Sequence, residues 1–316
     1  MCTFASNFHT DPNFLELKKI IEGKDEHGEN NVVAFFGSGM STNLCSWNNL
    51  IQQVCNNCDI DEGKNLSKDV DVAKNLELAE KAKDRNQKLY WQVLVDVFGG
   101  DYMNHYYPLL TDIPFKCYVT TNYDHQLADC SRGKLPPTSQ FGKIFRFKES
   151  TPADIRNRNI HYVHGYIPRV NDDTPEIDLQ IVLTHSEFED AYKKSSRLPL
   201  FLTDLFTNHN LLFLGCELKE QKLIDLLEDC MAVRADGGNR PDANKRFILK
   251  SAIYSNKNRD RQFELENDEK KFYEKYGITV LRFENKKNNF ALLHDILAAL
   301  AGRSPHNFFS PPSIKI

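Results

Sequence analysis

The chain has 316 residues, of which 41% are hydrophobic, and a formal net charge of −4. This length allows one large domain or two small ones, and the apolar content is sufficient for a sizeable core. The charge balance does not indicate a nucleic-acid binder or a membrane-surface protein. The sequence contains no apolar run of about 18 residues, so no transmembrane helix is predicted. The polar N-terminus does not resemble a secretory signal.

Eight cysteines are scattered through the sequence, and Cys55 and Cys58 form one C-x-x-C pair. No second pair follows at the spacing of a zinc ribbon or a redox motif. We therefore expect reduced structural cysteines, no bound metal and a cytoplasmic protein.

The first elements along the chain are a helix and a buried strand. Apolar residues between 14 and 21 predict a leading helix that ends near Gly23. Residues 32–36 form a continuous apolar run, which is typical of a strand buried on both faces of a parallel sheet. The glycine-rich segment 37–41 (Gly-Ser-Gly-Met-Ser) follows at once, and a helix is predicted over 47–54. A strand, a glycine turn and a helix in this order aim backbone N–H groups at a phosphate.

The rest of the chain alternates between predicted helices and strands. A helical pattern runs from about 72 to 98 and stops at Gly99-Gly100. Further strands are expected at 116–121, 144–147, 160–163, 181–184, 211–214, 247–250 and 278–283. The alternation predicts an α/β fold with a doubly wound, parallel, Rossmann-like sheet.

We expect three parts along the chain. Residues 1–30 would form a helical extension, 31–302 the nucleotide-binding domain and 303–316 a C-terminal tail. The helical stretch near 60–110 would be a small lobe inserted in that domain. The segment 131–158 is rich in proline, serine and basic residues; it is a lid, a partner surface or simply a solvated face.

Four segments lie just past the ends of predicted strands, where a doubly wound sheet binds its ligand. They are the glycine-rich segment 37–41, Thr-Thr-Asn-Tyr-Asp at 120–124, His-Tyr-Val-His-Gly at 161–165, and the apolar run 211–214 with the turn after it. Each alone has a structural explanation, since Asn and Asp cap helices and glycine forms turns. The dinucleotide fingerprint of ordinary dehydrogenases is broken, because position 42 is Thr and no ribose-binding acid follows a second strand.

Two histidines lie three residues apart at a strand end, so their side chains point to opposite faces of the sheet. This disfavours a metal site that uses both His161 and His164. His164 precedes a glycine, and a histidine exposed there suits general-base chemistry near neutral pH.

The order and spacing of these segments resemble the sirtuin family. The finer resemblance is to a divergent sirtuin-like group of bacterial antiphage defence proteins that hydrolyse NAD. It includes Trp47 and Leu50 after the glycine-rich segment, Thr-Thr-Asn-Tyr-Asp at 120–124, and Ile181–Thr184 followed by Glu187-Phe188. The resemblance spans roughly residues 30–300. The sequence departs from that group at Ser38, Cys45 and Glu220, where Ala, Pro and Asp are common.

The resemblance implies roles for individual residues. The catalytic residues would be Asn122, which positions a water and the ribose, His164, the general base, and Asp124, which binds the nicotinamide amide or stabilises charge. The residues that would bind the dinucleotide are Gly37, Ser38, Gly39, Ser41, Trp47, Thr121, Gly215 and Cys216. Backbone N–H groups and hydroxyls of the glycine-rich segment would hold the pyrophosphate.

Protein-deacylating sirtuins carry a zinc module of two cysteine pairs after the His-Gly. Only Cys216 and Cys230 follow His164 here, so four ligands cannot be assembled. The sequence therefore predicts an NAD+ hydrolase with NAD as its substrate. Two alternatives stay open: a non-catalytic sensor of NAD or of an ADP-ribose derivative, and an ADP-ribosyltransferase; a plain oxidoreductase is disfavoured.

In the defence group, NAD hydrolysis stops the growth of the infected cell or kills it (abortive infection). Such an enzyme must be silent before infection, and the sequence shows no evident sensor domain. We therefore expect a separately encoded activator or sensor protein, or activation by self-assembly, and a homo- or hetero-oligomer. Direct binding of nucleic acid or of a membrane is not expected.

Overall fold

The computed structural model describes residues 8–25, 28–41, 44–64, 66, 72–100, 106–131, 142–146, 148–169, 180–218, 220–236, 244–252, 259–284 and 291–303. Its centre is a seven-stranded sheet whose strands are all parallel, in the order β3-β4-β2-β1-β5-β6-β7. The strands are β1 (Val32–Phe36), β2 (Cys117–Thr120), β3 (Ile144–Arg146), β4 (Asn159–Tyr162), β5 (Asn210–Leu214), β6 (Arg246–Ala252) and β7 (Ile278–Glu284). The predicted doubly wound parallel fold is confirmed.

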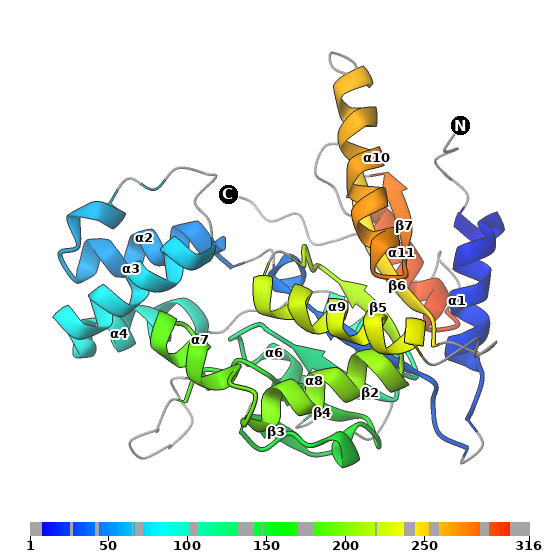
Figure 1. Cartoon of the computed structure of the whole chain (residues 1–316), viewed down its shortest axis with the longest axis horizontal. Helices are drawn as coiled ribbons and strands as arrows, with labels where there is room; N and C mark the ends of the chain where they lie inside the picture. The colour runs from blue at the N-terminus through cyan, green and yellow to red at the C-terminus, as the bar shows by residue number, and fades with distance from the viewer. Residues whose placement is uncertain are drawn as a thin grey trace.

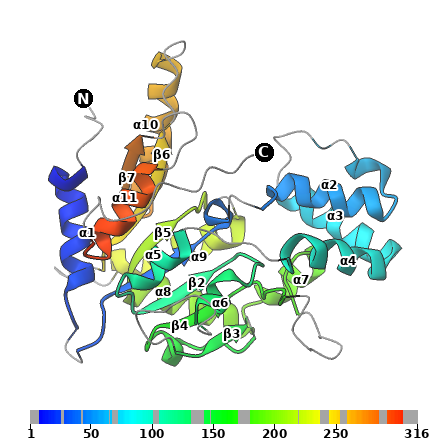
Figure 2. The ribbon, with the colours of Figure 1, turned by 180° about the vertical axis from the view of Figure 1, so that it is seen from behind.

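Helices cover both faces of this sheet (Figures 1 and 2). They are α1 (Pro12–Glu22), α2 (Trp47–Asn57), α3 (Val72–Arg85), α4 (Gln87–Phe98), α5 (Tyr106–Asp112), α6 (Gln126–Ser131), α7 (His185–Ala191), α8 (Arg197–Asn208), α9 (Gln221–Asp236), α10 (Arg259–Lys275) and α11 (Ala291–Leu300). Within the described ranges, no helix is both long and apolar enough to cross a membrane.

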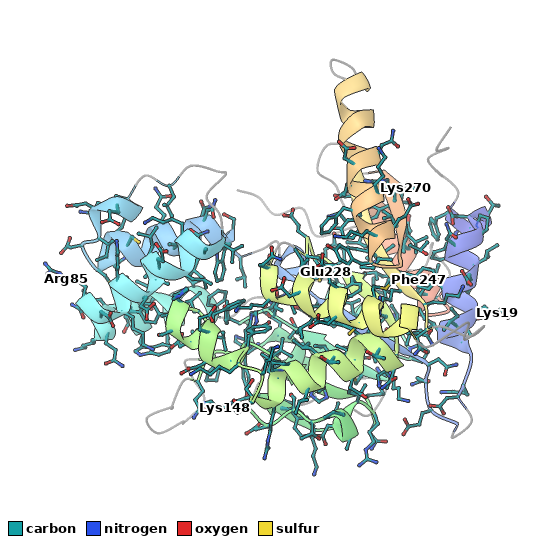
Figure 3. All side chains as sticks on the ribbon, viewed as in Figure 1. Lys19, Arg85, Lys148, Glu228, Phe247 and Lys270 are labelled. Carbon is teal, nitrogen blue, oxygen red and sulfur yellow. The ribbon has the colours of Figure 1, made fainter. Side chains whose placement is uncertain are left out.

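Side chains of the central strands alternate between two cores. In β1, Ala34 and Phe36 face a core that includes residues of α1, α5, α6 and α11, while Val33 and Phe35 face a core built with α8 and α9. Every residue of β1 is buried, as a strand covered on both faces requires. Phe247 of β6 is buried in the same way, whereas Lys19, Arg85 and Lys148 are exposed (Figure 3).

Helices α2, α3 and α4 form a lobe at one side of the molecule (Figure 1). They share a core of their own, which also includes Tyr123, Ile167 and Leu183 from segments that follow the strands. The lobe is therefore anchored at the edge of the sheet where the strands end. The helix predicted over 72–98 is two helices, because Asn86 interrupts it and caps α4 by accepting from Leu89 N at 3.1 Å.

The strand predicted at 181–184 is wrong. These residues are buried but join no strand; Val182 N donates to the His164 carbonyl at 2.9 Å, and Thr184 caps α7. An apolar run indicates burial, and here Ile181 and Leu183 are buried in the lobe core and Val182 in the core built with α8 and α9, without strand pairing. Of the segment 131–158, residues 132–141 and 147 lie outside the described residues. The division into domains stays a prediction.

Candidate functional site

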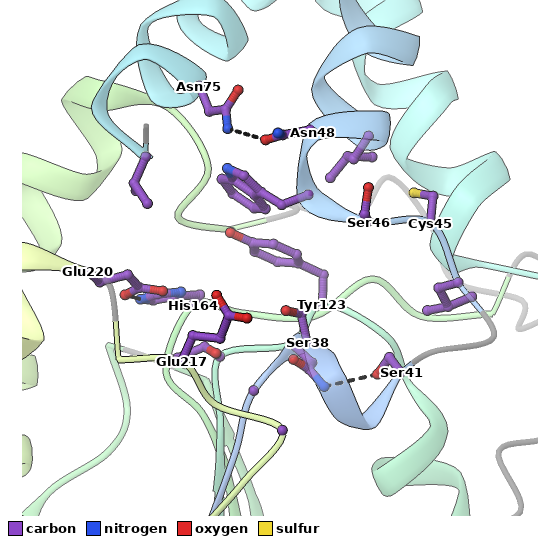
Figure 4. A pocket seen from close by; sticks show the side chains of 18 of the residues that line it. Ser38, Ser41, Cys45, Ser46, Asn48, Asn75, Tyr123, His164, Glu217 and Glu220 are labelled. Carbon is purple, nitrogen blue, oxygen red and sulfur yellow. Dashed lines mark hydrogen bonds and ion pairs between the residues drawn. The ribbon is translucent and has the colours of Figure 1, made fainter. Parts of the chain in front are cut away.

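A cavity of about 570 Å³ lies between the helical lobe and the ends of β1, β2, β4 and β5 (Figure 4). Within the sheet, β2 lies next to β1 in one direction and β5 lies next to β1 in the other. The strand order therefore reverses at β1. Open α/β sheets bind ligands at this switch point, beyond the carboxyl ends of the strands. The volume is that of a small-molecule site.

The structure brings the predicted site residues together. All of them except Gly39 line the cavity: Gly37, Ser38, Ser41, Trp47, Thr121, Asn122, Asp124, His164, Gly215 and Cys216. Segments far apart in the sequence therefore meet in one place.

Two glycine turns form the floor of this cavity and press against each other. Gly37 N donates to Leu214 O and Gly39 N donates to Gly215 O, both at 2.9 Å. A Cβ on Gly39 would lie 2.9 Å from Gly215 Cα, so glycine is required for the close approach. Gly39 therefore serves the packing of the turns, and its N–H is engaged inside the protein. The exposed residues of this turn are Ser38 and Gly39.

A buried hydrogen-bond network fixes the Asn122 side chain. Asn122 Nδ2 donates to Ser41 Oγ at 2.9 Å, and Ser41 Oγ donates to Asp124 Oδ2 at 2.6 Å. Asp124 Oδ1 accepts from Gln126 N at 3.2 Å, and burial raises the pKa of this carboxyl. The network holds the Nδ2 side of the amide. Among the described residues Asn122 Oδ1 has no hydrogen-bond donor, so it can accept from a ligand or water.

The two histidines of the 161–165 segment lie on opposite sides, as predicted. His161 bonds to Ser150 Oγ at 2.9 Å, away from the cavity, while His164 lines it. His164 Nε2 lies 2.9 Å from Tyr192 Oη and 3.8 Å from Glu220 Oε2. Burial lowers the pKa of His164 to about 3, so the imidazole is neutral near pH 7 and one of its two nitrogens carries no proton.

Sequence reasoning missed two residues that face His164. Tyr192 caps the end of α7, and nothing in its local sequence pointed to the site. Glu220 precedes α9 and lies beside His164 in Figure 4. Burial raises the pKa of Glu220 to about 7. The sequence signal at Glu220, five residues after Gly215, is only its departure from the resembling group.

Aromatic and amide side chains form the lobe side of the cavity. The rings of Trp47 and Tyr123 stack with centroids 6.1 Å apart, and Tyr123 Oη donates to Val182 O at 2.7 Å. Asn75 Nδ2 donates to Asn48 Oδ1 at 2.8 Å, above Tyr123 in Figure 4. This wall can pack against the flat face of a base or a pyridine ring.

Metal-ligand geometry is missing from the part of the chain that the structure describes: no three His, Cys, Asp or Glu side chains come together there as a metal would need. The cysteines that it describes are free thiols.

A doubly wound parallel sheet with paired glycine turns and a buried Asn and His at its switch point defines a nucleotide-binding α/β protein. The profile of the SIR2-like domain matches residues 116–281, just over half of the chain, and the protein belongs to this family. The predicted sirtuin-like identity is confirmed.

The chain is also similar to the protein named NAD(+) hydrolase ThsA from Cytobacillus dafuensis. The two are 23% identical over 219 residues, which cover 66% of this chain and 40% of ThsA. The chain therefore matches about two fifths of the length of that relative.

Proposed function

We propose that this protein is an NAD+ hydrolase that cleaves the bond between nicotinamide and ribose and releases nicotinamide and ADP-ribose. The observation that carries the proposal is the convergence of Asn122 and His164 on one cavity at the switch point of the sheet. The similarity to a protein named NAD(+) hydrolase supports the choice of substrate. A pure binding protein would have no need of a neutral, buried base beside a fixed amide.

Cleavage of an N-glycosidic bond develops positive charge on the ribose, as in other glycoside hydrolyses. Nicotinamide leaves as a neutral base, so its departure needs little help from an acid. Asn122 Oδ1 would accept a hydrogen bond from the attacking water. The water oxygen bonds to the anomeric carbon, and one water proton passes to His164. The exposed Ser38 would bind the pyrophosphate above the floor that the two glycine turns form, and the aromatic wall would pack against a ring of the substrate.

The resemblance to the defence proteins extends this proposal to the cell. NAD would be depleted when phage infection is sensed, in the cytoplasm and under the control of a separately encoded partner or of self-assembly. The measurement for this step is cellular NAD after phage challenge, in cells that express the wild-type chain or its Asn122→Ala variant.

The test of the activity is nicotinamide release from NAD+ by purified protein, followed by chromatography. Asn122→Ala and His164→Ala are each expected to lower the rate by about 10²-fold or more. Asn208→Ala, an exposed asparagine at the end of α8, is the matched control and should keep wild-type activity.

Rates near wild type in both site variants would refute the assignment. Tight NAD+ binding without release, in the presence of phage-infected cell extract, would favour a sensor. ADP-ribose found on protein by mass spectrometry would favour a transferase.

A further inference from the structure

We propose that Glu220 is a positioning residue for His164: its carboxylate keeps a proton on Nε2 and leaves Nδ1 as the nitrogen that accepts a proton. The kinetic part of this inference rests on the proposed NAD+ hydrolase activity. The structural part, which nitrogen of His164 carries the proton, is independent of any activity.

The contacts of His164 carry the inference. Both oxygen neighbours that the structure gives its imidazole, Tyr192 Oη at 2.9 Å and Glu220 Oε2 at 3.8 Å, lie at Nε2. Glu220 Oε2 is buried and has no hydrogen-bond partner among the described residues. When Nε2 carries the proton, its N–H can donate to the Tyr192 oxygen and also lies near the Glu220 carboxylate. When Nε2 carries no proton, the buried carboxylate oxygen has no donor near it on His164.

The backbone brings Glu220 to this place at a cost. Leu218, two residues before it, has φ of +50°, a left-handed conformation that non-glycine residues rarely adopt. Strained residues of this kind cluster at functional sites. Glu220 is the residue before the first turn of α9, because Leu223 N and Ile224 N donate to its carbonyl. Short polar residues are preferred at such a cap, and the longer Glu220 side chain reaches His164 instead (Figure 4).

The reaction would use this arrangement as follows. The bond between the anomeric carbon and the nicotinamide nitrogen breaks, and its electron pair leaves with neutral nicotinamide. The water oxygen bonds to the anomeric carbon, a water O–H bond breaks, and the proton moves to His164 Nδ1. The imidazole then carries protons on both nitrogens and a positive charge. The Glu220 carboxylate stabilises that charge from the Nε2 side, as the carboxylate of a Ser-His-Asp triad does from the opposite nitrogen. No oxidant or further reactant is needed.

The pH dependence follows from the groups around Glu220. Tyr123, Tyr192 and Cys216 interact with it and stay protonated and neutral near pH 7, because burial raises the pKa of each. Glu220 itself titrates near pH 7, since burial raises its pKa to about 7. Its active form is the carboxylate, which is present above that pKa and is lost as the pH falls through it. Activity of the wild-type protein should therefore fall on the acid side of about pH 7.

The kinetic test compares the full-length wild type with Glu220→Gln, which keeps the shape of the side chain and removes the charge. We expect kcat near pH 8 to fall by about 10-fold or more with little change in KM, and the acid limb near pH 7 to disappear. Glu220→Asp should restore part of kcat. Glu228→Gln, an exposed glutamate on α9 (Figure 3), is the matched control. A Glu220→Gln variant with wild-type kcat and an unchanged acid limb would overturn the proposal.

Nuclear magnetic resonance of the ¹⁵N-histidine-labelled chain tests the tautomer directly, with His164→Gln to assign the signal. We expect the proton of His164 on Nε2 in the wild type near pH 8, and a shift towards Nδ1 in Glu220→Gln. A wild-type His164 with its proton on Nδ1 refutes the inference even if NAD+ is cleaved. The expected tautomer in a chain that does not cleave NAD+ would instead count against the proposed function alone.

Discussion

Replacing Gly215 with alanine should push apart the two glycine turns that form the floor of the cavity. Gly215 has φ of +63°, and this left-handed conformation costs a residue with a side chain about 1–2 kcal/mol. The added Cβ would lie 2.4 Å from Met40 N and 2.7 Å from Gly39 C, both of which are backbone atoms. Overpacking of this kind costs about 1–3 kcal/mol more. We expect Gly215→Ala to lower the free energy of unfolding by about 2–5 kcal/mol.

Gly28→Ala separates the two contributions to this loss. Gly28 has φ of +76°, and a Cβ there would meet no atom of the described residues within 4 Å, so this variant measures backbone strain without a collision among them. Its expected loss is about 1–2 kcal/mol. The assay is urea denaturation followed by tryptophan fluorescence, with both variants in the same buffer. Equal losses in the two variants would show that the turns do not press against each other, and would refute the reasoning.

Two further predictions concern the lobe. Tyr123→Phe removes the hydrogen bond to Val182 O and keeps the ring packing, so it should cost about 1–2 kcal/mol in urea denaturation; a change below about 0.3 kcal/mol would contradict the contact. Lys83→Met breaks the half-buried ion pair with Glu187, which joins α3 to α7, and should cost about 0.5–1 kcal/mol at low salt. The loss should shrink in high salt, and an undiminished loss would show that packing of the lysine on Trp91 dominates.

The central strands were predictable because parallel strands buried on both faces need unbroken apolar runs. Val32–Phe36 and Leu211–Leu214 have this pattern, and the structure pairs them side by side. The meeting of their turns was predictable as well, since parallel strands end at one edge of the sheet. The site residues predicted at those turns, among them Ser38, Asn122 and Gly215, do line the cavity.

Other features depend on packing that a single sequence does not contain. Ile181–Thr184 has the apolar pattern of a strand, but Ile181 and Leu183 pack in the lobe core and Val182 in the core built with α8 and α9. The backbone N–H of Val182 donates to the His164 carbonyl and not to a strand. Glu220 and Tyr192 come from two different turns, and only the fold brings both to His164 Nε2. The break at Asn86 had a local signal, because asparagine is a preferred cap, yet the flanking helical periodicity concealed it.

The buried network around Ser41 links the position of the first glycine turn to the orientation of the Asn122 amide. Ser41 belongs to the first glycine turn, and its hydroxyl both accepts from Asn122 Nδ2 and donates to Asp124. The two oxygens of Asp124 accept from Ser41 and from Gln126 N, so its carboxylate is engaged with the protein. A ligand that moved the turn would therefore also move the hydroxyl that holds Asn122. One serine side chain makes the position of the first glycine turn and the direction of Asn122 Oδ1 mutually dependent.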